Sequence, residues 1–139
     1  MEIIKITNPT SDDVKSVVDG VVEYGMSQVN GVEPKQWVIH AIENGEIVGG
    51  ATGRIHFSQL YLDNLWVKKE IRNQGIGSKI HEEVVRLSKD SSCSRIQLNT
   101  LNEKAVKFYA RLDYEILAEI DDYVDGFCLY YMTKKMDIL

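Results

Sequence analysis

The chain has 139 residues, of which 44% are hydrophobic and 27% charged, and its formal net charge at pH 7 is −5. This length and composition suit one compact domain, residues 1–139, which buries roughly two thirds of the surface of its unfolded chain. The acidic balance argues against nucleic acid as a main partner, because phosphate backbones are bound through basic surfaces. No segment approaches the roughly 20 apolar residues of a membrane span, so we expect no membrane partner either.

The two cysteines, Cys93 and Cys128, are far apart and form no CxxC pattern. They predict neither a disulfide framework nor a zinc site, and they indicate a reducing, cytoplasmic setting. The three histidines are scattered along the chain, and lone histidines are more often structural than metal ligands. We therefore expect no metal.

The first elements in chain order are a short strand over residues 2–7 and a helix. Thr10 or Ser11 can cap the helix, and its valines recur at helical spacing before it ends between Gly25 and Gly31. Two strands follow over residues 37–42 and 47–57, joined at Asn44-Gly45, which is a strong hairpin signal.

Glycines interrupt the second strand of this hairpin, at positions 49, 50 and 53. They indicate a bulge or a close approach by another backbone, although simple tolerance explains them equally well. The remaining pattern predicts four strands, two helices and a final turn. These are strands over 60–67 and 95–100, helices over 75–89 and 103–112, and strands over 114–120 and 127–133 across a turn at 121–126.

Residues 72–77 read Arg-Asn-Gln-Gly-Ile-Gly, between the predicted strand 60–67 and the predicted helix that follows. Two glycines let the backbone pass close to a ligand, and the unpaired amides of a helix's first turn can donate to phosphate oxygens. Four cations and one anion lie between Lys68 and Lys79, which gathers positive charge at this loop. Ordinary solvation explains that cluster equally well. The loop is a candidate pyrophosphate cradle.

Two common nucleotide motifs do not fit the loop. A P-loop needs Gly-Lys followed by Ser or Thr, whereas the order here is Gly77-Ser78-Lys79. A dinucleotide fingerprint needs a third glycine three positions after the second, where this chain has Ile80. Both readings are therefore weak.

Three segments together resemble the GNAT superfamily of acyl-CoA dependent N-acyltransferases. They are Leu62-Asp63-Asn64-Leu65-Trp66-Val67, the loop 72–77 with the family pattern R/Q-x-x-G-x-G/A, and Asn102 with the helix through Phe108-Tyr109. The resemblance covers nearly the whole chain and implies a single-domain α/β (mixed α+β) fold. In that fold a central, mostly antiparallel mixed sheet of about seven strands is flanked by helices. Relatives usually have glycine where this chain has Asp113, and we expect Asp113 to adopt the left-handed conformation there.

The resemblance implies acetyl-CoA as co-substrate. Its pyrophosphate is expected on the amides of the loop, and its pantetheine arm on exposed strand backbone. The implied cofactor-binding residues are Leu65, Trp66, Val67, Arg72, Asn73, Gln74, Gly75, Ile76, Gly77, Ser78, Asn102 and Tyr109.

The same resemblance implies a direct attack of an amine on the thioester. Tyr109 matches the family's tyrosine that protonates the departing thiolate, although packing in the helix face would also explain it. Asp63 stands where many relatives carry a carboxylate and could accept the amine's proton, directly or through a water; alternation could also point it at solvent. The expected acceptor is the primary amine of a small molecule or peptide, and we expect a monomer or homodimer.

Six acidic residues and no lysine or arginine lie between residues 113 and 125. By resemblance this segment is close to the acceptor entrance, so Asp121, Asp122 and Asp125 could attract a cationic amine. A solvated acidic turn that only aids solubility explains them as well. A catalytically silent acyl-CoA-binding module is the alternative function, and a nucleotide-binding protein is disfavoured by the motifs discussed above.

Overall fold

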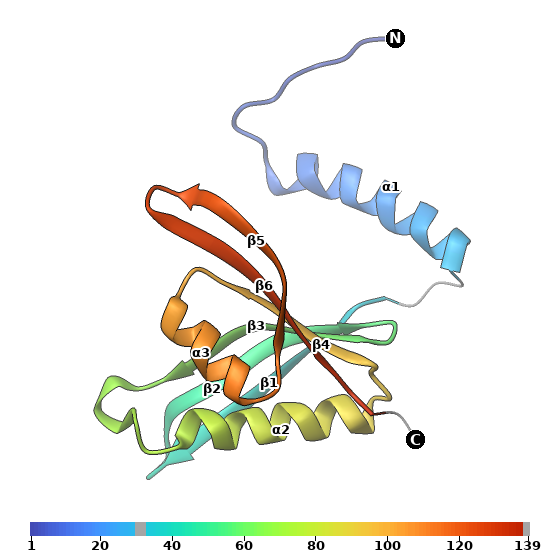
Figure 1. Ribbon diagram of the computed structural model, residues 1–139. Coiled ribbons are helices and arrows are strands. Elements are labelled where there is room, and N and C mark those ends of the chain that lie inside the picture. The colour runs from blue at the N-terminus through green and yellow to red at the C-terminus, as the bar shows by residue number, and fades with distance from the viewer. Residues whose placement is uncertain (30–32, 138–139) are drawn as a thin grey trace. The chain divides into compact units, whose positions relative to one another are not determined.

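The computed structural model describes residues 1–29 and 33–137, and the chain separates into two compact units, Met1–Glu33 and Pro34–Leu139. The first unit contains helix α1 (Ser11–Val29) (Figure 1). Its start is a capping box, because the Asp13 amide donates to Thr10 Oγ1 (3.1 Å) and the Thr10 amide donates to Asp13 Oδ2 (2.8 Å). The predicted helix is confirmed; the far end of the range predicted for its last turn, at Gly31, lies outside the described residues.

The strand predicted over residues 2–7 is wrong. In the structure these residues have no regular secondary structure, and Ile3, Ile4 and Ile6 are exposed. Isoleucines favour extended backbone, but a strand also needs a neighbour for its N–H and C=O groups. None of the strand pairs in the described residues includes this segment, which leaves six strands where about seven were expected.

The second unit is an open six-stranded sheet in the order β1-β2-β3-β4-β6-β5 (Figure 1). Neighbouring strands are antiparallel except β3 and β4, which are parallel. The strands are β1 (Lys35–Glu43), β2 (Glu46–His56), β3 (Gln59–Val67), β4 (Arg95–Thr100), β5 (Glu115–Val124) and β6 (Phe127–Lys135). The helices are the short 3₁₀ helix η1 (Lys69–Ile71), α2 (Ile76–Asp90) and α3 (Glu103–Arg111). This is the mixed, mostly antiparallel fold that was expected.

Two tight turns close the hairpins. Asn44 and Gly45 both have positive φ (51° and 79°), as a two-residue hairpin turn that matches strand twist requires. The second turn is shorter than predicted: β5 runs on to Val124, which pairs with Phe127, so only Asp125 and Gly126 remain in the turn. Asp-Gly is itself a favoured two-residue turn, and it allows the strand pairing to continue beyond residue 120.

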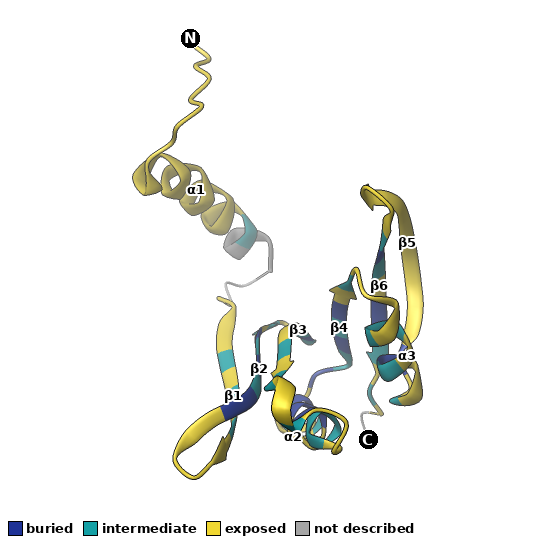
Figure 2. Cartoon of the chain, turned by 90° about the vertical axis from the view of Figure 1, so that its left-hand side faces the viewer, coloured by how far each residue is buried: buried dark blue, intermediate teal, exposed yellow. Residues whose placement is uncertain are grey.

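The core of the second unit lies between the sheet and the helices α2 and α3. Leu60, Val84 and Ile96 are fully buried in it, together with side chains from β6 and α3 (Figure 2). Gly53 permits close packing of the strands, because a Cβ there would come within 1.8 Å of the Tyr61 carbonyl oxygen and 2.6 Å of the Trp37 ring. The close backbone approach predicted for this strand is confirmed.

The sheet is joined at its centre by a short parallel contact. β3 and β4 pair at only three positions, Gln59 with Arg95, Leu60 with Ile96, and Tyr61 with Gln97. Beyond Tyr61 the two strands separate, although β3 continues to Val67 and β4 to Thr100 (Figure 2). The sheet therefore opens between its two central strands. No helix in the described ranges is long and apolar enough to span a membrane.

Candidate functional site

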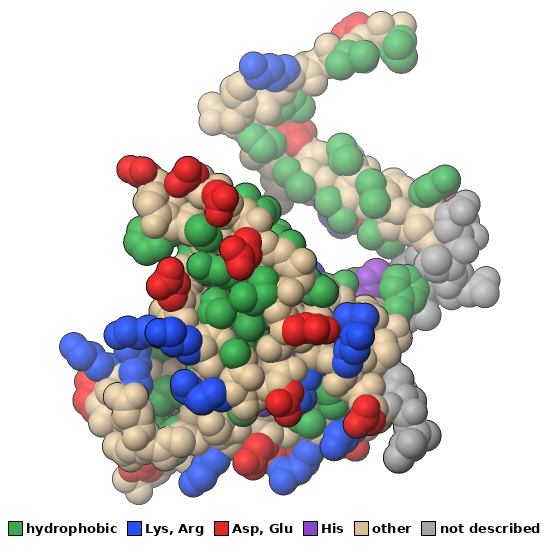
Figure 3. Space-filling view, viewed as in Figure 1, with side chains coloured by type: hydrophobic (Ala, Val, Ile, Leu, Met, Phe, Trp, Pro, Cys, Tyr) green, Lys and Arg blue, Asp and Glu red, His purple; other side chains and the backbone are tan. Residues whose placement is uncertain are grey.

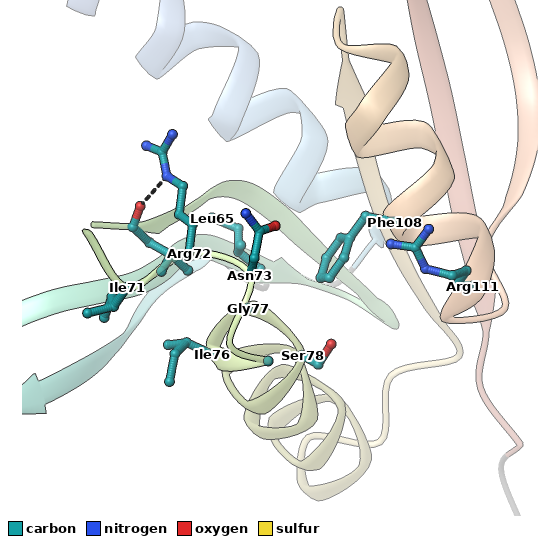
Figure 4. Close-up of a pocket in the computed structure, with 11 residues that line it drawn as sticks. Leu65, Ile71, Arg72, Asn73, Ile76, Gly77, Ser78, Phe108 and Arg111 are labelled. Atoms are coloured by element: carbon teal, nitrogen blue, oxygen red, sulfur yellow. Dashed lines mark hydrogen bonds between the residues drawn. The ribbon is translucent and has the colours of Figure 1, made fainter. Parts of the chain in front are cut away.

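A cavity of about 420 Å³ lies beside this opening, where β3, the loop after it, α2 and α3 meet (Figure 4). All of its lining comes from the second unit, and most of it from the predicted cradle. The lining residues are Leu65, Val67, Ile71, Arg72, Asn73, Gly75, Ile76, Gly77, Ser78, Phe108 and Arg111. Among them are eight of the residues that the family resemblance implies for binding acetyl-CoA.

The loop owes its shape to two residues with left-handed backbone. Asn73 has φ of 64° and Gly75 has φ of 80°. Asn tolerates this conformation better than most residues, and glycine adopts it without steric cost. Turns of this kind direct successive backbone N–H groups toward one side, which makes a concave site for anions.

The N-terminus of α2 presents unpaired donors to the cavity. The Lys79 amide makes the first bond within the helix, to the Gly75 carbonyl at 3.1 Å, so the amides of Ile76, Gly77 and Ser78 precede the helical ladder. No side chain caps this end, and no acidic residue lies in the first turn. A helix start of this kind favours a negatively charged ligand.

Cations flank the cavity on both sides. Arg72 comes from the loop, where its Nε donates to the Val67 carbonyl at 2.8 Å, and Arg111 comes from α3 (Figure 4). Lys68 and Lys69 precede Arg72 by four and three residues in the chain. In the space-filling view basic side chains gather over this region, whereas acidic ones follow the β5–β6 hairpin (Figure 3). The cavity therefore combines backbone donors with positive charge.

Strand β3 contributes one wall of the cavity. Leu65 and Val67 line it, whereas Trp66 between them is half exposed and does not, as the alternation of a strand requires. On one side the three residues pair with β2, and the ladder to β4 has ended before them. Apart from the Val67 carbonyl, which accepts from Arg72 Nε, their backbone groups on the β4 side are therefore available to an extended ligand.

Asn102 and Gln74 do not line this cavity. Asn102 caps α3, its Oδ1 accepting from the Lys104 amide at 2.8 Å, and it borders a second cavity of about 780 Å³ beside the β5–β6 turn. The Asn102 side chain thus has a structural role in the helix start.

Tyr109 is buried, with 8% of its surface exposed. Its ring packs edge-on against Phe108, Tyr114 and His81, with ring centroids 5.1, 5.2 and 6.5 Å away. Burial raises the pKa of the Tyr109 phenol to about 12, so the phenol carries its proton at neutral pH. Tyr109 does not line the cavity, although its neighbour Phe108 does.

His81 and Tyr114 form a buried polar pair behind Tyr109. His81 Nε2 lies 2.8 Å from the Tyr114 hydroxyl, and burial, with a smaller contribution from the charge of Lys134, lowers the pKa of His81 to about 4. The imidazole is therefore neutral at pH 7.

Asp63 lies at a bulge in β3. The strand register passes from Leu62, paired with Gly53, to Asn64, paired with Thr52, and leaves Asp63 as the extra residue. Arg54 Nη1 donates to both Asp63 carboxylate oxygens, at 3.0 and 3.1 Å. A bulge turns a side chain away from the face it would otherwise occupy. Asp63 accordingly borders a third cavity, lined also by Arg54.

The acidic residues of the hairpin are exposed. They line neither the cavity of about 420 Å³ nor the third cavity, which Asp63 borders. Asp121 and Asp122 belong to β5, where Cys128 Sγ donates to Asp121 Oδ1 at 3.5 Å, and Asp125 lies in the turn. No group of three or more potential metal-binding side chains occurs in the described residues.

Sequence reasoning missed several residues that line these cavities, among them Phe108, Arg111 and Arg54. Phe108 and Arg111 are three positions apart on α3, a spacing that puts them on one helix face and could have identified both. Arg54 had no such signal, because its pairing with Asp63 depends on the bulge.

Comparison with known proteins identifies the family. The acetyltransferase (GNAT) family model matches residues 10–114, three quarters of the chain. The chain belongs to the GNAT acetyltransferase family. It is therefore an acyltransferase enzyme of the N-acetyltransferase type.

Individual relatives agree with this assignment. The GNAT chain is 33% identical over 95 residues to blasticidin-S acetyltransferase of Streptomyces morookaense, covering 68% of this chain and 70% of that protein. The chain also matches mammalian thialysine N-epsilon-acetyltransferases, and the match spans 38–42% of the length of those proteins.

Solved structures show the same fold. An acetyltransferase from Bacillus cereus superposes with a TM-score of 0.85 at 25% identity, covering 96% of this chain and 98% of that one. Arabidopsis thaliana Naa50, in complex with the bisubstrate analogue CoA-Ac-MVNAL, superposes with a TM-score of 0.63 at 28% identity, covering 71% and 72%.

Proposed function

We propose that this GNAT protein transfers an acetyl group from acetyl-CoA to the primary amine of a small molecule or peptide, by direct attack. One observation carries the proposal. The N-terminus of α2 has no side-chain cap and follows a loop with left-handed residues, and it lies beside β3, whose ladder to β4 has ended before Leu65. A diphosphate with a long polar arm fits that combination, because it needs several N–H donors followed by an extended edge.

The donor is held mainly by backbone in this proposal. The pyrophosphate accepts from the amides of the first turn of α2, and Arg72 and Arg111 offset its charge. The pantetheine amides pair with β3 at Leu65–Val67, like an added strand. Trp66 takes part through its backbone, since its side chain points away from the cavity.

The reaction needs a free amine, a polarised thioester and a proton for the leaving group. An N–C bond forms as the C–S bond breaks, and the amine's proton goes to a base while the thiolate takes one from an acid. An alkylamine with a pKa about 3.4 units above pH 7 costs about 4.6 kcal/mol to deprotonate. Backbone amides of β3 near the bulge stabilise the oxyanion that develops.

Tyr109 is the proposed acid. Its phenol is protonated at every physiological pH, as an acid for the departing thiolate must be. Its place beside Phe108, which lines the donor cavity, supports the assignment. The phenol is only 8% exposed, so a modest turn of the ring accompanies binding in this scheme.

Asp63 is the proposed acceptor of the amine's proton, directly or through a water. It stands two residues before Leu65, at the vertex of the opening between β3 and β4. Arg54 Nη1 already donates to both carboxylate oxygens, and each oxygen keeps a second lone pair for the amine or the water.

A catalytically silent acyl-CoA-binding module is the second candidate. Two observations favour it: Tyr109 is buried, and the Asp63 carboxylate is already paired with Arg54. Two other observations support an active enzyme instead: the family consists of acetyltransferases, and β3 and β4 separate beyond Tyr61, next to Asp63.

An acetyl-CoA consumption assay with a panel of primary amines tests the enzyme against the silent module. We expect thiol release that depends on the amine, and a Tyr109→Phe variant that loses kcat by 10²-fold or more with little change in acetyl-CoA affinity. Binding of acetyl-CoA without consumption by any amine would favour the silent module. Stabilisation by ATP alone in a thermal shift assay would refute the donor assignment.

The wider setting is also proposed. We infer a cytoplasmic protein, since Cys93 and Cys128 are both free thiols, and a single catalytic domain over residues 1–139, since the family match runs across both units. We propose a monomer or homodimer, which sedimentation will distinguish.

A further inference from the structure

The third cavity lies at the vertex where β3 and β4 separate, and it has a volume of about 190 Å³. Two of its lining residues are charged, Arg54 and Asp63, and the rest are polar, tyrosine or aliphatic. These remaining residues are Tyr61, Leu62, Gln97, Leu98, Asn99, Leu117, Tyr131 and Met132. A bipolar group beside an apolar wall is the chemistry that this lining would recognise.

Arg54 is held in place while part of its guanidinium stays free. It pairs across the strands with Tyr61, and its Cζ lies 4.3 Å from the centre of the Tyr61 ring. Both bonds to Asp63 leave from Nη1. No hydrogen bond from Nε or Nη2 is seen within the part of the chain that the structure describes. The guanidinium can therefore offer a second edge to a carboxylate, the ligand that its planar fork fits best.

The ion pair is poorly explained as a device for stability. Its side chains are 46% and 42% exposed, and exposed pairs contribute little to folding. The pair nevertheless sits at the bulge, where the register is interrupted in order to place Asp63. Bulges beside binding sites commonly re-aim a side chain toward a ligand.

We infer that Arg54 and Asp63 together bind the α-amino carboxylate head group of a free amino acid, which is the acceptor. This inference rests on the proposed function. Arg54 binds the carboxylate through its free edge, and Asp63 faces the neighbouring amine, the one that is acetylated. Leu117 and Met132 contact an aliphatic or aromatic side chain.

The size of the cavity supports a small acceptor. The cavity has a volume of about 190 Å³. That space suits an amino acid and is too small for most drug-sized ligands, whose pockets are about 300–1,000 Å³.

The test compares each amino acid with the amine left when its carboxylate is removed. Leucine with 3-methylbutylamine, phenylalanine with phenethylamine, and lysine with cadaverine are titrated by calorimetry into the protein saturated with CoA. We expect at least one amino acid to bind tenfold or more tightly than its amine. Arg54→Met should abolish that difference, and Asp63→Asn should weaken the amino acid and the amine alike.

Arg86→Met is the matched control, because Arg86 is also an exposed arginine paired with an acidic side chain, Glu83, but on α2. It should keep the preference, and thermal melting checks that every variant is folded. Equal binding within all pairs, no binding in any pair, or an Arg54→Met variant that retains the preference would overturn the inference.

Failure of the inference and failure of the proposed function are distinguishable. Calorimetry needs no turnover, so amino acids that bind with the expected preference but are never acetylated would count against the enzyme alone. Acetylation of amines without regard to a carboxylate would count against the inference alone. Mass spectrometry of the product locates the acetyl group on the α-amine if both hold.

Discussion

Two glycines of the loop 72–77 should respond oppositely when each is changed to alanine. Gly75 has φ of 80°, and a Cβ there would meet nothing within 4 Å. Its replacement therefore costs only the left-handed conformation, about 1–2 kcal/mol of folding free energy. Gly77 lies in the first turn of α2 without positive φ, and its Cβ would lie 3.5 Å from the Phe108 ring and 3.9 Å from Leu65. These are ordinary contacts.

Gly77→Ala should accordingly keep or raise the stability, by up to about 1 kcal/mol from helix propensity. The new methyl group nevertheless enters the cavity beside two of its lining residues, Leu65 and Phe108. Charge-assisted hydrogen bonds contribute about 1.5–3 kcal/mol each, so displacing one phosphate oxygen from the helix amides should weaken acetyl-CoA binding about tenfold or more.

Urea unfolding and calorimetric titration of acetyl-CoA measure the two effects separately. Gly75→Ala should lose stability, whereas Gly77→Ala should lose affinity without losing stability. Equal destabilisation of both variants would contradict the assigned backbone conformations. A Gly77→Ala variant that binds acetyl-CoA as tightly as the parent would refute the placement of the pyrophosphate against the first turn of α2.

Three further predictions concern stability and the acceptor. The pKa of His81 is about 4 in the folded protein and 6.5 in the unfolded chain, so the unfolded chain binds more protons between these values. The free energy of unfolding should therefore fall by on the order of 3 kcal/mol as the pH drops from 6.5 to 4. Urea unfolding of His81→Gln should show a weaker dependence of stability on pH. Asp113→Gly should raise the unfolding free energy by about 1 kcal/mol, since residue 113 has φ of 69°, and an unchanged midpoint would contradict this. Charge reversal at both Asp121 and Asp122 should raise the KM for cationic acceptors; unchanged kinetics would leave the acidic hairpin with a role in solubility only.

The sequence predicted the elements of the sheet and helices well, because their signals are local. Asn44-Gly45 marks its turn by backbone preference, and Asp113 adopts the left-handed conformation expected where relatives have glycine. The strand at residues 2–7 failed because pairing is not local: isoleucines make extended backbone favourable but supply no neighbouring strand.

The candidate site also has parts that local sequence signals predict and parts that depend on packing between elements. The candidate cradle could be located because its glycines and the helix start lie within six residues of one another, and these residues line one cavity in the structure. The partners of Asp63 and Tyr109 come from other elements, and their geometry depends on a bulge and on ring packing. Neither Arg54 beside Asp63 nor His81 behind Tyr109 follows from spacing along the chain.

The three-residue parallel contact between β3 and β4 also has a consequence for folding order. β1, β2 and β3 are joined by short turns, so we expect them to pair early, and we expect β3 to pair with β4 only after the crossover through α2 has formed. Pulsed hydrogen exchange should therefore protect the amides of β2 before those of β4. Both proposed sites border that junction, so they would be the last parts of the molecule to be assembled.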